Sequence, residues 1–344
     1  MFIDLIPPIC RKLAGAYALN SPYDPTFLRS FNLYNAATKE FLGANIPHVI
    51  LVANRDEAMD QAINQFGNTG IVFGASFLYH KLIDRLNLSL NAKALTHQAI
   101  QVARDTSEGI TKHAKTVAKQ WVFKSPKAQL WYNLGKGLAI YTFLGSYVVA
   151  SPFFRNWVTL KRTKSLNYTA MVGLTKKDLT EKEKSELKQK ERFNLKEFAK
   201  IWGIGTGVSL AILGATQALI RRGAGVPKLF KFLEKHLGLP HGDFRHFKDL
   251  PMYLFWALPA YSGLLFASRD ALERKEIYYR MAGFGLAFMV LPRTLERWIN
   301  NAVKGKTFKV FGPGKNVAYL GHLLSGLIFY TSIPTIITES LRSP

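Results

Sequence analysis

The stretch IWGIGTGVSLAILGATQALI, residues 201–220, has twenty residues and no ionisable side chain. A bilayer core about 30 Å thick needs about 20 apolar residues at a rise of about 1.5 Å each. Helices and closed barrels are the structures that satisfy the backbone in such a core. Similar stretches occur at 137–154, 250–268 and 316–338. The sequence therefore predicts an all-α, polytopic helical membrane protein with about five to six transmembrane helices and amphipathic surface helices.

The charge balance of the chain indicates its partners. Lys and Arg number 46 against 23 Asp and Glu, a formal net charge of +23 in 344 residues. Basic residues crowd the segments beside the apolar stretches, so anionic membrane lipid is the expected partner. No zinc finger or RNP motif indicates nucleic acid. Cys10 is the only cysteine, which excludes an internal disulfide and a multi-cysteine metal site.

The chain divides into four predicted regions. They are an amphipathic N-terminal region (1–60), a first membrane pair (61–154) that contains a basic interfacial helix (92–123), a charged helical connector (155–200) and a C-terminal membrane bundle (201–338). Aromatic residues at helical spacing predict a helix over 26–42 in the first region.

The predicted spans are 61–83, 131–153, 201–220, 250–268, 281–292 and 317–338. Two of them are doubtful crossings, because 61–83 is polar in its first half and 281–292 has only twelve charge-free residues. The second span is expected to close near Pro152 and Trp157. Thr180 and Glu183 fit a capping box, so one helix is expected to run from 181 to about 221.

Small residues recur at a spacing of four on the third span, at Gly203, Gly207 and Ala211. This spacing lets helices approach closely in lipid. One interpretation is a contact between two copies of the chain, which makes a homo-oligomer a candidate. Packing within the chain is the favoured interpretation, because several spans share one chain.

Several ionisable residues fall within or at the end of predicted spans, and groups at that depth are candidates for function. His80 and Lys81 end the first span, and Arg280 adjoins 281–292. Three of these residues are singled out as candidates. They are His80, Lys136 and His322. A lysine near a span end can extend its amine to the interface, which accounts for Lys136. A neutral imidazole bonded to a neighbouring helix accounts for His322.

The densest group of possible metal ligands is His236, His241 and His246. Steps of five residues put no two of these histidines on one helical face, so they are weak metal candidates, and a polar interfacial loop is the default interpretation. We expect no cofactor. No nucleophile-and-base pattern or paired acids stand out either, so no catalytic residue is assigned.

These observations favour a non-enzymatic membrane scaffold or packing protein on anionic lipid. The alternative is a transporter or channel, for which Gln217, Asn133 and His322 are the supporting polar residues. A membrane enzyme acting on lipid is the third hypothesis, with the 236–246 loop as its site. A polar cavity that reaches into the apolar layer would support transport, and three converging histidines would support catalysis.

Overall fold

The computed structural model describes residues 30–32, 45–52, 54–97, 123–173, 179–237, 246–248 and 253–286, with residue 41 and short pieces between 298 and 337. Its helices are α3 (Ile46–Ile50), α4 (Arg55–Thr69), α5 (Ser76–Asn91), α8 (Pro126–Thr163), α9 (Tyr168–Gly173), α10 (Glu181–Arg221), α11 (Lys228–Leu237), α13 (Leu258–Phe266) and α14 (Ala271–Gly285). The described strands, of two or three residues, are β1 (Ser30–Asn32), β2 (His246–Lys248), β3 (Thr307–Phe308) and β4 (Gly312–Pro313). The fold is all-α, as predicted.

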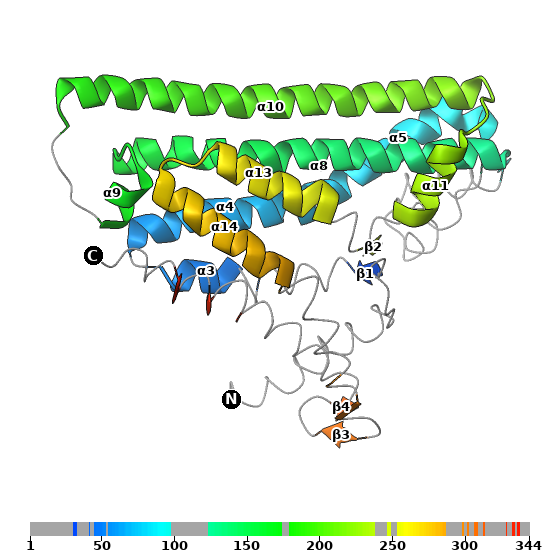
Figure 1. Ribbon diagram of the computed structural model, residues 1–344. Helices are drawn as coiled ribbons and strands as arrows, with labels where there is room; N and C mark the ends of the chain where they lie inside the picture. Colours follow the sequence, from blue (N-terminus) through cyan, green and yellow to red (C-terminus); the bar gives the residue numbers. More distant parts are fainter. Residues whose placement is uncertain are drawn as a thin grey trace, which may run out of the picture.

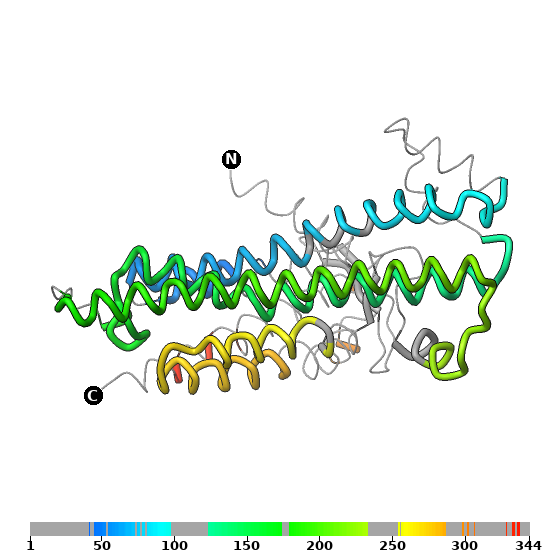
Figure 2. Tube along the Cα trace, turned by 90° about the horizontal axis from the view of Figure 1, so that it is seen from above, coloured from blue at the N-terminus to red at the C-terminus, as the bar shows by residue number. Residues whose placement is uncertain are grey.

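Three long helical rods form the centre of the molecule. A π-helical segment, Gly70–Ala75, joins α4 to α5 into one rod over 55–91. α10 lies along α8 and runs in the opposite direction (Figure 1). Viewed from above, the α4–α5 rod lies on one side of α8, and the α13–α14 hairpin lies on the other (Figure 2).

Close contact between α8 and α10 depends on glycine. A Cβ atom added to Gly205 would overlap the side chain of Ser146, and one added to Gly135 would overlap Thr216. The helices therefore pack closely at two levels, which fixes their register. As a result the charge-free stretch 137–154 of α8 lies beside the charge-free stretch of α10.

α10 is the single helix that the sequence predicted. The hydroxyl of Thr180 accepts a hydrogen bond from the Glu183 N–H, and the Glu183 carboxylate accepts one from the Thr180 N–H at 2.8 Å. This is the predicted capping box. The helix continues without a break through the charged half and the apolar half to Arg221.

α8 continues as a helix beyond Pro152 and Trp157, near which the second span is predicted to close. The helix continues to Thr163 and ends at Lys164, which has a left-handed backbone (φ 54°). Proline cannot donate to the carbonyl four residues earlier, which is that of Val148. The Ser151 hydroxyl lies 3.3 Å from that carbonyl oxygen. Packing on both sides of α8 then holds the last turns in place.

Two other predicted segments take different local structures. Ser30–Asn32 is a strand that pairs antiparallel with β2, rather than part of a helix over 26–42. A strand of three residues is stabilised by its partner more than by its own periodicity, so a local pattern does not reveal it. Of the interfacial helix 92–123, the structure describes 92–97 and 123, where Ala92–Ala94 form a 3-10 turn; the rest lies outside the described residues.

Two of the described helices, α8 and α10, are long and apolar enough to cross a membrane. The predicted count of five to six crossings is therefore not reached in the described part of the chain. Segment 61–83 lies within the α4–α5 rod, and 250–268 is described from 253 as a π-helical turn (Tyr253–Ala257) followed by α13. Segment 281–292 is described to 286, and most of 317–338 lies outside the described residues.

Candidate functional site: a buried charge cluster beside a polar cavity

Four buried charged side chains from distant parts of the sequence meet at one end of the apolar stretch of α8. We call Asp60, Arg155, Arg269 and Glu273 the charge cluster. α4 contributes Asp60, α8 contributes Arg155, the turn between α13 and α14 contributes Arg269, and α14 contributes Glu273. Asp60 is 0% exposed, and Arg155 and Glu273 are each 3% exposed.

Helix starts position the acidic residues. Asn54 caps α4 by accepting from the Glu57 N–H at 2.9 Å, and Asp270 caps α14 by accepting from the Glu273 N–H at 2.9 Å. Each glutamate therefore lies in the first turn of its helix, where the helix dipole favours a carboxylate. Two helix N-termini thus bring acidic side chains to the same end of the bundle.

Gly263 brings the α13–α14 hairpin onto α8. A Cβ atom at this position would clash with the backbone of Val149. About two turns further along α8, the Asn156 side chain donates to the carbonyl oxygen of Ala267 at 2.6 Å. These contacts place the turn after α13, which contains Arg269, beside Arg155 of α8.

The cluster is an alternating chain of charges. Arg269 binds Asp60 through both terminal nitrogens, at 3.0 and 3.1 Å, and binds Glu273 at 2.9 Å. Arg155 donates to Glu273 at 2.6 Å. The Thr159 hydroxyl donates to Asp60 at 2.6 Å. Each buried charge therefore has a partner of opposite charge, and the Arg269–Asp60 pair is bidentate.

These pairs keep the carboxylates ionised. Burial alone would raise the pKa of Asp60, but Arg269 and Arg155 outweigh it and hold this pKa below its ordinary value. The pKa of Glu273 is lowered by the same two guanidinium groups against the same opposing burial. Burial opposes the charge of Arg269 too, yet the two carboxylates raise the pKa of this guanidinium.

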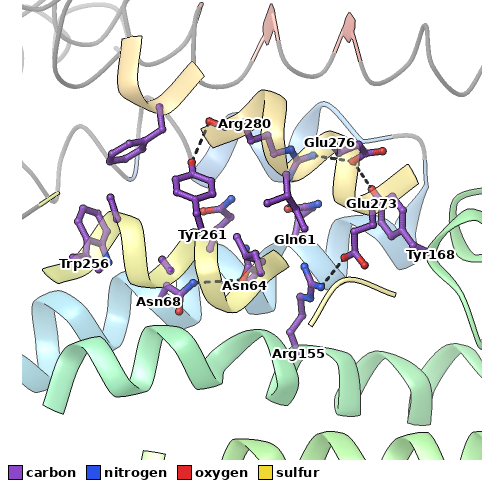
Figure 3. A pocket seen from close by; sticks show the side chains of 16 residues that line it. Gln61, Asn64, Asn68, Arg155, Tyr168, Trp256, Tyr261, Glu273, Glu276 and Arg280 are labelled. Carbon is purple, nitrogen blue, oxygen red and sulfur yellow. Dashed lines mark hydrogen bonds and ion pairs between the residues drawn. The ribbon is translucent and has the colours of Figure 1, made fainter. Parts of the chain in front are cut away.

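Tyr168 of α9 links a second pair of carboxyl groups to the cluster. Its hydroxyl oxygen lies 2.9 Å from Glu57 and 3.0 Å from Glu276. The Arg269 guanidinium lies over the Tyr168 ring, 4.9 Å from its centre. Figure 3 shows Tyr168 and Glu276 side by side, with Arg280 on the other side of Glu276 at 3.8 Å.

A cavity of about 60 Å³ lies between α4, α8, α13 and α14, next to this pair (Figure 3). One face of α4 lines it with four amide side chains, those of Gln61, Asn64, Gln65 and Asn68. The Arg280 guanidinium donates to the Gln61 side chain at 3.0 Å. A cavity with this many polar groups is suited to hold water or a small polar solute.

The cavity extends from the charge cluster along α4 to Asn68. Ser151 of α8, within the charge-free stretch, donates to Asn68 at 2.6 Å. Trp256 and Tyr261 close this part of the cavity. Among the residues that the structure describes, no three His, Cys, Asp or Glu side chains are placed to hold a metal ion.

Lys136 lies at the other end of the apolar stretch, and its side chain does not extend to water as the sequence suggested. It is 1% exposed and lies 2.6 Å from Asp84 of α5. Tyr132 also binds Asp84. A buried ion pair, rather than an extended lysine, therefore explains this residue.

The other predicted site residues are not brought together. Gly203, Gly207 and Ala211 are exposed on α10, and a Cβ atom added to either glycine would meet nothing within 4 Å. Packing against α8 uses Gly205 on the neighbouring face instead. The side chains of His80, His236 and His246, together with His241 and His322, lie outside the described residues. The histidine loop is therefore not assessed.

The charge cluster is not among the predicted sites, although the sequence contains a signal for it. Asn54 and Asp270 are each followed three residues later by a glutamate, which is the pattern of a capped helix start. Asp60 and Arg155 directly flank charge-free stretches, where a charge marks the boundary of the stretch but does not reveal its own partner. Comparisons with protein families, curated proteins and solved structures found no match for this chain.

Proposed function

We propose that the chain is an integral membrane protein in which α8 and α10 cross the bilayer as an antiparallel hairpin. The observation that carries this proposal is the exposure of the apolar stretch of α10, of which only 33% is buried, against 61% for α8. Ile204, Val208 and Leu210 are 60%, 47% and 54% exposed. An apolar face of this length is unusual in contact with water and suits lipid.

The dimensions agree with a crossing. The charge-free stretches 137–154 and 201–220 have 18 and 20 residues, which is about 27 and 30 Å of helix. The charge cluster lies just outside one end. The protein is expected to remain with membranes after carbonate extraction. Recovery of most of it as a soluble monomer without detergent would refute the proposal.

Within the membrane we propose a non-enzymatic scaffold or packing role. The exposed stripe of Gly203, Gly207 and Ala211 supports it, because these small residues leave room for the backbone of another helix. The net charge of +23 suits a surface of anionic lipid. The proposed partner for the stripe is a second copy of this chain.

Cysteine cross-linking tests this role. In a Cys10→Ser background, Gly207→Cys in membranes is expected to form a disulfide-linked dimer under mild oxidation. Leu78→Cys is the matched control, because Leu78 lies on a different helix, α5, and is 67% exposed. Equal dimer yields at the two positions, or none at either, would contradict a specific contact along α10.

The polar cavity favours a second candidate, a transporter or channel. Four amide side chains and Arg280 line a space that extends into the apolar layer, and polar groups at such depth commonly mark solute or ion pathways. Flux of ions or small polar solutes across proteoliposomes tests this candidate. Flux equal to that of empty vesicles would reject it.

A further inference from the structure

A sharp turn after α10 places the short helix α11 against α8. α10 ends at Arg221, and Gly223 follows with a left-handed backbone (φ 62°), a conformation that favours glycine. The carbonyl oxygen of Ala224 then accepts a hydrogen bond from the indole N–H of Trp131 at 3.0 Å. The ring centre of Phe230 lies 5.7 Å from that of Trp131. One side of α11 therefore packs on the first turns of α8, and the helix turns away from the line of α10 (Figures 1 and 2).

Two apolar side chains of α11 are exposed. Leu229 and Phe232 are 64% and 57% exposed, whereas Phe230 is partly buried against α8. Residues three apart on a helix are neighbours, so Leu229 and Phe232 share one face. Lys228 and Lys231 share the adjacent face, and both are exposed. A helix with an exposed apolar side next to lysines is the pattern of a helix that lies in a membrane interface.

The position of α11 along α8 matches the depth of lipid headgroups. Trp131, which contacts α11, precedes Gly137 by six positions, and Gly137 begins the charge-free stretch of α8. Six residues are about 9 Å of helix. The headgroup layer on each side of a bilayer core is about 5–8 Å thick. If α8 crosses a bilayer, α11 therefore lies within or just beside the headgroups.

This end of the molecule is strongly basic. Residues 123–132 and 221–237 contain seven Lys and Arg and one acidic residue, Glu234. By contrast, 155–200 at the opposite end mixes thirteen Lys and Arg with six Asp and Glu. Besides the two lysines of α11, the exposed basic residues here include Lys124, Lys127, Arg221 and Arg222. A surface with so few acidic residues attracts anionic headgroups.

We propose that α11 is an interfacial helix that binds anionic lipid. Leu229 and Phe232 contact the upper acyl chains, and Lys228 and Lys231 bind the headgroups. The inference rests on the proposed crossing of α8 and α10, and it names the surface that contacts lipid and the kind of lipid it binds. Lipid is the occupant of this face rather than a second copy of the chain, because two copies of so basic a surface would repel each other.

Fluorescence quenching by nitroxide-labelled lipids tests the proposal with the full-length chain reconstituted into vesicles. A fluorophore on Leu229→Cys, in a Cys10→Ser background, should be quenched more by nitroxide-labelled phosphatidylserine than by the same mole fraction of nitroxide-labelled phosphatidylcholine. High salt should reduce this preference, because salt screens the lysines. Lys231→Cys is the matched control on the polar side of the same helix, and its label should be quenched less by either lipid.

Charge variants test the role of the lysines. Lys228→Gln together with Lys231→Gln should lower the preference for phosphatidylserine by up to about fivefold per lysine. Lys182→Gln together with Lys184→Gln, two exposed positions at the far end of α10, is the matched control and should leave the preference unchanged.

A label on Ile204→Cys reports the crossing separately, because Ile204 is 60% exposed within the apolar stretch of α10. Quenching at Ile204 without quenching at Leu229 would mean that another protein segment covers α11, so this inference would fail while the crossing stands. Absence of quenching at both positions would overturn both proposals. Equal quenching of the Leu229 label by the two lipids, or a preference that the lysine substitutions leave unchanged, would overturn the binding of anionic lipid.

Discussion

Gly205 and Gly207 are two residues apart on α10 and have opposite surroundings. Gly205 packs on Ser146 of α8, whereas Gly207 has nothing within 4 Å of an added Cβ atom. The close contact between α8 and α10 is thus made by one glycine, and the neighbouring face of α10 is left open. Residue spacing alone indicates Gly207, and not Gly205, as the packing residue. Spacing shows which small residues share a face of the helix, but it does not show what that face contacts.

Leucine substitutions at these two glycines should distinguish the packed face of α10 from its open face. Gly205→Leu is expected to lower the free energy of unfolding by about 1–3 kcal/mol or more, because α8 and α10 must move apart. Gly207→Leu should leave the monomer unchanged or slightly more stable, since leucine favours a helix over glycine by roughly 0.5–1 kcal/mol. Thermal unfolding in detergent measures both. Equal losses would mean that Gly207 also packs within the chain.

Asp60 should determine how the protein responds to acid. Its pKa and that of Glu273 lie below their ordinary values of 3.8 and 4.5. The unfolded chain therefore takes up protons first as the pH falls. The stability from these groups is present above the ordinary values and is lost as the pH falls below them, through the lower pKa values of the folded state. Asp60→Asn should lower the free energy of unfolding by about 3–5 kcal/mol at neutral pH, because it removes one partner of a buried pair. The free energy of unfolding of this variant should also fall less than that of the wild type as the pH is lowered.

The control for this prediction is a half-exposed ion pair. Asp56 lies 3.2 Å from Arg162, and their side chains are 25% and 31% exposed. Asp56→Asn should cost at most about 1 kcal/mol. Unfolding curves between neutral pH and pH about 3 compare the two variants. An acid response of Asp60→Asn that matches the wild type would show that the cluster does not control acid stability.

At the scale of the element, α8 shows how packing overrides a local signal. Pro152 removes one backbone hydrogen bond, yet the helix continues for eleven residues beyond it. An interior proline costs about 3 kcal/mol relative to alanine. The α4–α5 rod, α10 and the α13–α14 hairpin all contact this helix, and their combined burial outweighs that cost.

Pro152→Ala should therefore stabilise the protein. The gain of a hydrogen bond to Val148 is partly offset by the loss of about two buried methylene groups, so the net increase should be about 1–2 kcal/mol. Pro126→Ala is the matched control, because Pro126 is the first residue of α8, where proline is well tolerated, and its effect should be near zero. Chemical unfolding compares them. A destabilised Pro152→Ala would mean that the ring itself is needed for packing.

Elements were predictable where the signal is local. α10 follows from a capping box and an unbroken pattern, and both lie within its own sequence. The continuation of α8 past Pro152 and the strand Ser30–Asn32 depend on partners far along the chain. The charge cluster depends on distant partners most of all, since Asp60 and Arg269 are separated by 209 residues. No single helix contains the information that places them together.

At the scale of the whole molecule, a buried ion pair lies at each end of the charge-free stretch of α8. Lys136 with Asp84 lies at one end of the charge-free stretch of α8, and Arg155 with Glu273 lies at the other. The two residues of α8 are nineteen positions apart, which is about 28 Å along a helix. This matches the thickness of a bilayer core. If α8 and α10 cross a bilayer, as proposed, the arrangement predicts which surfaces share one of its sides.

Cysteine accessibility tests this topology in a Cys10→Ser background. Lys164 and Lys182 are exposed at the end where α8 finishes and α10 begins, and Lys127 and Arg222 are exposed at the opposite end. If α8 and α10 cross as a hairpin, an impermeant thiol reagent added to sealed vesicles should label Lys164→Cys and Lys182→Cys together. Lys127→Cys and Arg222→Cys should then be labelled only after the vesicles are permeabilised, or the reverse, according to orientation. Labelling of all four positions in sealed vesicles would mean that the hairpin lies outside the bilayer, and the exposed face of α10 would then need a protein partner instead of lipid.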